Sequence, residues 1–222
     1  MQQLVLFGAG SLAKVLIDLL RDDEQYDVIA VIVDDHYINS TAINLKGVPI
    51  VGLSEALLNQ KLLDCEMLMT VGYASMRKRQ ESFEKLKKCG FRMHSFISKD
   101  ATVASSAVVG EGCIIFPNVV IEPDCILGCN NIIWSNATVC HDSIIDSHNF
   151  IAAGVVIGGE VNIGSLCFFG FSSVIIQQAK VADETLLAAN SLLIDSSQKA
   201  TAYKGSPATA FKIHETQGIC IK

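Results

Sequence analysis

Two adjacent residues in the second half of the chain, His141 and Asp142, are of types that can move a proton. An imidazole with a pKa of about 6.5 exchanges its proton near neutral pH, which suits it to general-base catalysis. A neighbouring carboxylate can orient the ring and stabilise its charged form. His141 follows the apolar Val139 by two residues, and this spacing predicts an exposed corner of the chain. From the pattern alone, a histidine that is only solvated is the more common interpretation of such a position.

A second candidate site lies near the N-terminus, where a glycine-containing loop joins an apolar run to a helical pattern. Residues 8–13 read Gly-Ala-Gly-Ser-Leu-Ala and follow the apolar run 3–7. Backbone N–H groups at the start of such a helix can hold a phosphate, although a tight turn without a ligand explains the loop equally well. Asp34 and Asp35 end the next apolar run and can accept hydrogen bonds from a ribose or a base. We expect only one of these two aspartates to bind, since a solvated strand end is the alternative.

The elements that must position these residues fall into two halves with different periods. Roughly the first 95 residues alternate between short apolar runs and amphipathic stretches, which is typical of a parallel sheet with helices on both faces. Pro49 marks its strand as an edge or a loop, and Ser54 is the expected N-cap of the next helix. The predicted strands cover 3–7, 28–33, 48–51 and 67–71, and the predicted helices cover 11–20, 54–58 and 75–88.

From Ile97 the apolar pattern changes to a period of six, which holds through seventeen consecutive positions to Leu193. A six-residue unit is too short for a helix or a hairpin and describes a short strand plus a corner. Three such units close one turn of 18 residues, so this segment predicts a parallel β-helix of a little over five turns. Cys113, Cys125 and Cys167 occupy positions of small inward side chains, and we expect them in the core without chemistry.

Composition and charge exclude several classes of protein. Half of the 222 residues are hydrophobic and 18% are charged, which is the opposite of a disordered chain. The net charge is −6, and the densest basic run, 76–79, fits the solvated face of a helix, so we expect no nucleic-acid partner. The uncharged stretch 161–179 keeps the period of six, so we expect no membrane insertion. Eight cysteines without a CxxC pair, and no secretion signal, indicate free thiols in the cytoplasm.

Taken in order, these motifs resemble the hexapeptide-repeat acyltransferases, in the branch of bacterial nucleotide-sugar acyltransferases that includes sialic-acid O-acetyltransferases and amino-sugar N-acetyltransferases. The similarity runs from residue 3 to about residue 212 and is specific through the combination of motifs rather than through the glycine loop alone. The segments that carry it are 7–14, 33–35, 46–52, 71–72 with 76–79, 139–142 with its His-Asp pair, and 205–208 with Gly-Ser-Pro-Ala.

The resemblance implies a left-handed β-helix and three parts of the chain. These are a Rossmann-like nucleotide-sugar-binding domain at 1–95, the β-helix acyltransferase domain at 96–195, and a C-terminal loop and tail at 196–222 that covers the cofactor. It implies acetyl-CoA as cosubstrate, no metal, and a homotrimer with acetyl-CoA between neighbouring coils. The implied activity is N-acetylation of a nucleotide-linked amino sugar, such as a UDP- or dTDP-4-amino-4,6-dideoxy-hexose, for bacterial lipopolysaccharide or another surface glycan.

The same resemblance implies roles for individual residues. His141 is the expected general base and Asp142 its orienting partner, although the family often has Glu at the second position. The place of a second family histidine is Phe150 here, so His148 receives no role, and Trp134 is expected at a subunit interface rather than against a substrate. The expected cofactor-binding residues are Gly159, Ala189, Gly205, Pro207, Ala208 and Lys212, with Lys204 as an alternative cation, and the expected substrate-binding residues are Gly8, Gly10, Ser11, Asp34, Asp35 and Gly72.

Other functions stay open at this point. The enzyme can be an O-acetyltransferase of sialic acid or another sugar, or the chain can be a non-catalytic subunit that binds a nucleotide sugar without CoA turnover. A zinc hydratase on a β-helix is disfavoured because catalytic zinc takes three protein ligands and the repeats hold only His141 and His148. Gly159 also has an alternative explanation, as a corner glycine that needs a positive φ.

Overall fold

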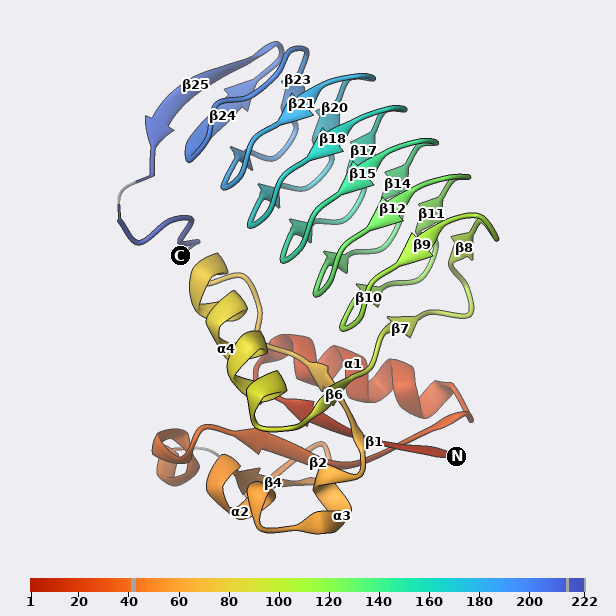
Figure 1. Cartoon of the computed structure of the whole chain (residues 1–222), viewed down its shortest axis with the longest axis vertical. Coiled ribbons are helices and arrows are strands. Elements are labelled where there is room, and N and C mark those ends of the chain that lie inside the picture. The colour runs from red at the N-terminus through yellow and green to blue at the C-terminus, as the bar shows by residue number, and fades with distance from the viewer. Residues whose placement is uncertain (41–42, 215, 222) are drawn as a thin grey trace. The chain divides into compact units, whose positions relative to one another are not determined.

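The computed structural model describes residues 1–40, 43–214 and 216–221, and the chain divides into two compact units (Figure 1). The first unit comprises Met1–Gly72 and Glu81–His94, and the second comprises Tyr73–Gln80 and Ser95–Lys222. Helix α4 (Met76–Lys88) therefore contributes its first residues to the second unit and its remainder to the first. Within the described part of the chain, every helix is too short or too polar to cross a membrane.

The first unit is built on a six-stranded sheet with the order β3-β4-β2-β1-β5-β6. Neighbouring strands are parallel, except that β3 and β4 form an antiparallel hairpin. The central strands end in fully buried apolar residues, so the expected alternation of buried strands and helices is confirmed. The strands are β1 (Gln2–Phe7), β2 (Tyr26–Val33), β3 (Asn44–Leu45), β4 (Val48–Gly52), β5 (Glu66–Met69) and β6 (Arg92–Met93).

The helices of this unit follow the expected amphipathic pattern. In α1 (Ser11–Asp22) the buried side chains recur at positions 12, 13, 16, 17 and 20, which form one apolar face. The N-cap of α1 is Gly10, which has no side chain to bond the first N–H groups of the helix. The other helices are η1 (Asp35–Ser40), α2 (Leu53–Leu57), α3 (Gln60–Leu63) and α4.

Two local predictions for this unit are wrong. Ser54 does not cap α2: it lies in the first turn, where its hydroxyl donates to Asp35 Oδ2 at 2.6 Å and its amide donates to Asp35 Oδ1 at 3.0 Å. Asp35 thus supplies, from another segment, the acceptor that an N-cap side chain provides. The sequence predicts Pro49 in a loop or an edge strand, but it lies within β4. The two-residue strand β3 pairs with the outer side of β4 and is itself the edge of the sheet.

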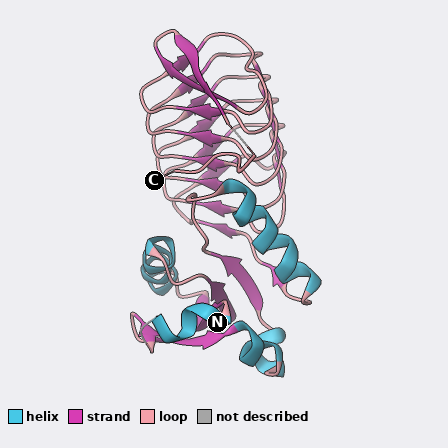
Figure 2. Ribbon diagram, turned by 90° about the vertical axis from the view of Figure 1, so that its left-hand side faces the viewer, coloured by secondary structure: helices cyan, strands magenta, loops and turns pink. Residues whose placement is uncertain are grey.

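The second unit contains the predicted parallel β-helix, whose stacked turns run from β7 to β23 (Figures 1 and 2). Each two-residue strand pairs with the strand 18 positions away, as in Ile115 with Ile133 and Ile133 with Ile151. The second residue of every strand is a member of the six-residue apolar register, and from Ile115 to Leu193 all of these members are buried. The first three members lie in the terminal turn, which has a neighbouring turn on one side only, and they are exposed or half-buried.

The strands form three coil sheets. The first coil sheet contains β7 (Phe96–Ile97), β10 (Ile114–Ile115), β13 (Ile132–Ile133), β16 (Phe150–Ile151), β19 (Phe168–Phe169) and β22 (Leu186–Leu187). The second contains β8 (Thr102–Val103), β11 (Val120–Ile121), β14 (Thr138–Val139), β17 (Val156–Ile157), β20 (Val174–Ile175) and β23 (Leu192–Leu193). The third contains β9 (Val108–Val109), β12 (Ile126–Leu127), β15 (Ile144–Ile145), β18 (Asn162–Ile163) and β21 (Lys180–Val181).

The corners between these sheets share one backbone conformation. From Gly112 to Asn190 every sixth residue has a positive φ, between 53° and 71°, and the set includes Asp142 and His148. Asn, Asp and Gly tolerate this left-handed conformation best, and they fill most of the positions. A second period of six, in corner residues, therefore accompanies the apolar one.

The coil ends in an antiparallel hairpin of β24 (Thr201–Gly205) and β25 (Ala208–Ile213). Strand β24 extends the first coil sheet by pairing in parallel with β22. Ser206 and Pro207, joined by a cis peptide bond, form the turn of the hairpin. Near its end the chain bonds the first residue of α4, where the Ile219 carbonyl accepts from the Met76 amide at 3.2 Å.

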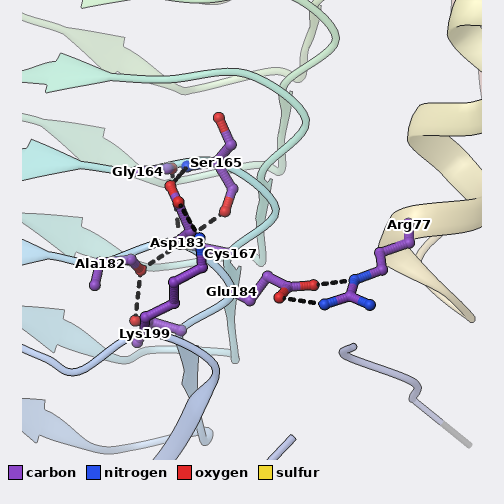
Figure 3. Close-up of polar contacts among 9 residues, drawn as sticks. Arg77, Gly164, Ser165, Cys167, Ala182, Asp183, Glu184 and Lys199 are labelled. Carbon is purple, nitrogen blue, oxygen red and sulfur yellow. Dashed lines mark hydrogen bonds and ion pairs between the residues drawn. The ribbon is translucent and has the colours of Figure 1, made fainter. Parts of the chain in front are cut away.

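The basic run at the start of α4 is not a solvated face, so that prediction is wrong. Arg77 forms a bidentate ion pair with the buried Glu184, at 2.5 Å from Nε to Oε1 and 2.7 Å from Nη2 to Oε2 (Figure 3). Beside it, Asp183 accepts from the Ser165 amide and from Lys199 Nζ, both at 3.0 Å, and these bonds lower the pKa of Asp183. Charged side chains thus tie the first turn of α4 and neighbouring corners of the coil together.

Arg79 is fully buried. Its Nη2 donates to the Asn130 carbonyl at 2.5 Å and to Asn130 Oδ1 at 2.7 Å, while Nε and Nη1 have no partner among the described residues. Burial lowers the pKa of Arg79 to about 9. The helical spacing explains the burial, since position 79 falls on the same face as the buried Met76, Phe83 and Leu86.

Candidate active site

His141 lies on the corner between the second and third coil sheets, just after β14. The imidazole Nδ1 is 2.8 Å from Asp142 Oδ2, and both side chains are more than half exposed. With Nδ1–H donating to the carboxylate, Nε2 is the nitrogen left to accept a proton. The left-handed φ of 59° at Asp142 turns the chain at this point. The predicted pair is therefore brought together on an exposed corner, as its spacing indicated.

Carboxylates dominate the electrostatics of the ring. The hydrogen bond to Asp142 raises the pKa of His141, and the negative charges of Asp142, Glu122 and Glu160 add to this effect. The sequence pattern did not single out Glu122, whose Oε2 accepts from the His141 amide at 2.9 Å. A turn of 18 residues places 122–124 on the same corner one turn earlier, and this spacing was the available signal.

Gly159 lies on the same corner one turn later and is buried. A Cβ built on Gly159 would be 2.9 Å from both Cε1 and Nε2 of His141. Neither Gly158 nor Gly159 has a positive φ, so the alternative explanation of Gly159 as a left-handed corner glycine is wrong. The left-handed residue of this corner is Glu160. Glycine is needed at 159 because the imidazole approaches the backbone closely.

Adding one methyl group at Gly159 tests this arrangement. In Gly159→Ala we expect the imidazole to be pushed off its position, and a displacement of about 1 Å at a reacting group costs up to about 100-fold in rate. We therefore expect at least a tenfold loss of kcat in the acetyl transfer that the sequence resemblance implies. Gln177→Ala, at the same corner position one turn further, is the control and should leave kcat unchanged. Equal kcat in the two variants would show that the ring does not depend on this contact.

The other predicted cofactor residues lie on a different corner, between the first and second coil sheets. Ala189 is exposed there, and the hairpin joins this corner through the bond from the Gly205 amide to Ser191 Oγ at 3.0 Å. Gly205 has a φ of 99° and ends β24, directly before the turn that contains Pro207. Ala208 opens β25 and Lys212 follows it on the exposed part of that strand, while Lys204 Nζ lies 4.9 Å from the centre of the Phe211 ring. Gly159 and Ala189 are thus not brought together on one corner.

The predicted substrate residues of the first unit gather at one edge of its sheet. Gly8 follows β1, Asp34 follows β2, and Gly72 lies three residues after β5. These three strands are adjacent and parallel, so their carboxyl ends share one edge, which is where open α/β sheets bind ligands. Gly8 has a φ of 107° and packs against Thr70, whose hydroxyl donates to the Phe7 and Gly8 carbonyls at 2.9 and 2.7 Å.

The two aspartates at this edge, Asp34 and Asp35, differ in how many of their carboxylate oxygens already accept hydrogen bonds. Both carboxylate oxygens of Asp35 accept hydrogen bonds from Ser54, and these bonds lower the pKa of Asp35. Asp34 Oδ1 pairs with Lys85 Nζ at 2.6 Å. Ser11, exposed at the start of α1, and Gly10 before it complete the edge. Asp34 is therefore the better placed of the two to meet a ligand.

Trp134 and His148 pack within the chain. Trp134 stacks on Phe116, the equivalent corner residue one turn earlier, with ring centres 4.1 Å apart and an angle of 6°. His148 is buried, and its Nδ1 lies 2.9 Å from Asn130 Nδ2, next to Arg79. The ring of Phe150, at the position where the sequence resemblance implied a second histidine in some relatives, stacks on Phe168. Among the described residues, no three His, Cys, Asp or Glu side chains gather as metal ligands would.

Comparisons with known proteins agree with this architecture. Residues 3–86 match the family model of the PglD N-terminal domain, and residues 97–204 match that of the GMPPB C-terminal domain. The chain is similar to the acetyltransferase domain of PglB from Neisseria gonorrhoeae, with 24% identity, a TM-score of 0.84, and coverage of 95% of this chain and 100% of that one.

Two further solved structures share the fold over nearly the whole chain. One is a mutant of perosamine N-acetyltransferase from Caulobacter crescentus in complex with CoA and GDP-perosamine, with 24% identity, a TM-score of 0.84, and coverage of 96% and 98%. The other is WeeI from Acinetobacter baumannii, with 18% identity, a TM-score of 0.83, and coverage of 95% and 100%. These similarities confirm the expected fold, an α/β domain with a parallel sheet followed by a left-handed parallel β-helix.

Proposed function

We propose that this protein is an acetyl-CoA-dependent N-acetyltransferase that acts on a nucleotide-linked amino sugar, such as a 4-amino-4,6-dideoxy-hexose. The observation that carries the proposal is the exposed His141, with Nδ1 held by Asp142, on a β-helix that follows an α/β domain with an open helix N-terminus. The similar perosamine N-acetyltransferase was solved with CoA and GDP-perosamine, which supports both substrate classes. A product of this kind belongs to the synthesis of bacterial surface glycans.

The chemistry of the step follows from the free Nε2 of His141. The sugar amine attacks the thioester carbonyl of acetyl-CoA, so that a C–N bond forms and the C–S bond then breaks. The attacking nitrogen loses its proton to Nε2, and the departing CoA thiolate takes up a proton. Asp142 keeps the ring in the tautomer that this transfer needs and stabilises the imidazolium that forms. Backbone amides hold the oxyanion of the tetrahedral intermediate.

For acetyl-CoA, the chain offers surfaces without bulky side chains and the two exposed lysines of the hairpin, Lys204 and Lys212. Ala189 is small and exposed, and the hairpin turn from Gly205 to Ala208 is joined to the same corner by the bond from the Gly205 amide to Ser191 Oγ. Lys212 is exposed on β25 and is the proposed partner of a CoA phosphate. Gly159 lets the imidazole lie close against the backbone of the next turn, and the thioester must come to this ring to react.

For the nucleotide, the proposed site is the carboxyl edge of the sheet in the first unit. The uncapped N–H groups at the start of α1, at Ser11, suit the diphosphate. Asp34 suits the ribose or the base, and Gly72 leaves an open approach because a Cβ built on it would meet no atom within 4 Å. Asp35 is less suited than Asp34 to bind the nucleotide, since both of its carboxylate oxygens already accept hydrogen bonds from Ser54.

Gly10→Ala separates a ligand-binding role of the loop from a structural one. A Cβ built on Gly10 meets no atom within 4 Å, and its φ of −80° suits any residue. Losing glycine as the N-cap destabilises the fold by about 0.5–1 kcal/mol. The lower entropy of the unfolded alanine variant stabilises the fold by a similar amount. We therefore expect an almost unchanged free energy of unfolding. The methyl group would meet the diphosphate, so the KM for the nucleotide sugar should rise about tenfold.

Gly8→Ala is the matched control for the glycine loop. Its φ of 107° and the 3.3 Å approach to Thr70 make alanine strained there with or without a ligand, so it should lower the free energy of unfolding. Thermal unfolding and steady-state kinetics of both variants distinguish the cases. An unchanged KM in Gly10→Ala would remove the loop from the proposed phosphate site.

We further propose a homotrimer. The outward residues of the first three strands of the third coil sheet, Val108, Ile126 and Ile144, are 57%, 47% and 41% exposed and form an apolar column beside the His141 corner. Such a column is typical of an interface. The proposed cofactor residues occupy two different corners, and neighbouring copies can bring such corners together. Sedimentation velocity measures the state, and a monomer at micromolar concentration would contradict the trimer.

The reaction is proposed to take place in the cytoplasm. All eight cysteines are free thiols, and Cys113, Cys125 and Cys167 are buried in the coil as expected. Burial raises the pKa of Cys113 to about 11 and that of Cys167 to about 12, so these thiols are inert at neutral pH.

The function is tested with acetyl-CoA and a panel of UDP-, dTDP-, GDP- and CMP-linked sugars, with release of free CoA thiol as the readout. We expect thiol release that depends on a nucleotide-linked amino sugar. Release with sialic acid or a hydroxy sugar alone would favour the O-acetyltransferase instead. Binding of a nucleotide sugar without any thiol release would favour a non-catalytic subunit.

A further inference from the structure

The carboxylate of Glu122 braces the corner that carries His141. The Glu122 amide donates to the Val139 carbonyl at 2.9 Å, which ties Glu122 to the end of β14. Its side chain then returns to the same segment, where Oε2 accepts from the His141 amide at 2.9 Å. Two bonds from one residue thus fix the chain on both sides of Cys140, directly before the left-handed Asp142.

Side chains also bond corner amides elsewhere in this coil, as Asp183 does for Ser165. The His141 corner differs because the bonded amide belongs to His141 itself. The imidazole of this residue must stay close to Gly159. A shift of the His141 peptide would therefore move Nε2 directly. The bond between Glu122 and the His141 amide therefore affects the position of the proposed base as well as the fold.

The charge of Glu122 acts on the ring together with two other carboxylates. Asp142 is in contact with Nδ1 in the same turn, Glu122 approaches from the preceding turn, and Glu160 belongs to the following turn, where its carboxylate accepts from Gln178 Nε2 at 3.2 Å. The charged groups that act on the ring are these three carboxylates. An imidazolium at this corner is therefore stabilised from three consecutive turns.

We propose that Glu122 is a positioning residue for His141, which fixes the peptide that carries the imidazole and adds a negative charge that stabilises the protonated ring. This inference rests on the proposed function for its catalytic meaning. The position of the His141 peptide and the effect of the Glu122 charge on the ring are properties of the protein without substrates, and they can be measured in that state. A sugar that arrives as an ammonium ion also meets a negative corner, whereas a neutral hydroxyl gains nothing from it.

Three variants separate the two parts of this role. Glu122→Gln keeps a carbonyl oxygen that can accept from the His141 amide but removes the charge. Glu122→Ala removes both the acceptor and the charge. Asp124→Asn is the matched control, because it removes one negative charge from the same corner and turn, and Asp124 is not among the groups that shift the titration of His141. Asn also suits the left-handed φ of 61° at position 124.

The first measurement is an NMR titration of the free protein labelled at histidine Cε1, with the His141 signal among the five histidines assigned from a His141→Asn sample. We expect the midpoint of His141 to move to lower pH in Glu122→Gln and to stay at the wild-type value in Asp124→Asn. An unchanged midpoint in Glu122→Gln would overturn the electrostatic role. This readout needs no acetyl transfer, so it stands or falls separately from the proposed function.

The second measurement is kcat for acetyl transfer at a pH above the midpoint, where the ring is neutral in every variant. We expect Glu122→Gln to stay within about threefold of the wild type and Glu122→Ala to lose about 10- to 100-fold, as a displaced base would. Wild-type kcat in Glu122→Ala would overturn the positioning role. Failure of the wild type itself to acetylate any amino sugar would overturn the proposed function and leave the titration result intact.

Discussion

Replacing His141 by alanine should lower the turnover of acetyl transfer by about 10²- to 10⁴-fold, the range that general-base catalysis supplies. The expected loss follows from Nε2, which is the ring nitrogen left free when Nδ1 bonds Asp142 at 2.8 Å. The side chain is more than half exposed, so the variant should fold like the wild type. Steady-state kinetics with the amino-sugar substrate, together with circular dichroism, measure both properties.

The pH dependence supplies a second readout of the same residue. The bond to Asp142 and the neighbouring carboxylates raise the pKa of His141 above its ordinary 6.5. A raised pKa keeps the ring protonated to higher pH, and only the neutral ring can take a proton. kcat/KM should therefore increase with pH through a midpoint above 6.5, and His141→Ala should lose this limb. Near-normal turnover with an unchanged pH profile in His141→Ala would exclude His141 as the base.

The largest expected loss of stability comes from Phe169→Ala. Phe169 is fully buried and is the one aromatic residue in a register that is otherwise Ile, Val and Leu, so its ring fills the middle of the coil. Removing it leaves a cavity between stacked turns that pair tightly on both sides, and such a change costs about 3–5 kcal/mol. Chemical denaturation followed by circular dichroism measures the change in the free energy of unfolding.

Phe169→Leu is the graded control for this prediction. Leucine matches the rest of the register and fills most of the same space, so it should cost less than half as much as alanine. Equal losses in the two variants would indicate that the ring contributes by something other than filling the coil. No loss in Phe169→Ala would contradict the packing of the inward register itself.

The sequence predicted the coil well because its physics is local and repeated. One inward side chain every six residues is visible without any long-range information, and each strand that contains such a residue pairs 18 positions away. The corners carried a second signal that the apolar pattern does not use, namely a left-handed residue at every sixth position, most often Asn, Asp or Gly. That signal places Asp142 in a left-handed conformation directly after His141.

The errors arise where a distant segment decides the environment of a residue. Ser54 has the type of an N-cap, but Asp35 takes the capping role from a different segment. Arg79 has the type of a solvated residue, but the helical period places it on the buried face of α4, against Asn130 of the coil. Hydropathy alone misassigns such residues, whereas periodicity would have identified Arg79.

For the candidate active site, residue types and spacing predicted the His141–Asp142 pair but not the partners in adjacent turns. The contact with Gly159 and the bond from Glu122 both depend on the stacking of turns at one corner. Once three strands per turn are assumed, positions 18 residues apart become neighbours, and these contacts become predictable. Their detailed geometry still depends on side-chain conformations that a pattern does not contain.

The central claim is that this chain moves an acetyl group from acetyl-CoA to a sugar amine. Its most direct test is mass spectrometry of the products formed from a matched pair of nucleotide sugars that differ only by an amino or a hydroxyl group at one carbon. The claim predicts that the amino sugar alone gains one acetyl group, at a rate that His141→Ala greatly reduces. Acetylation of the hydroxy sugar alone, or of neither sugar in any nucleotide series, would contradict it.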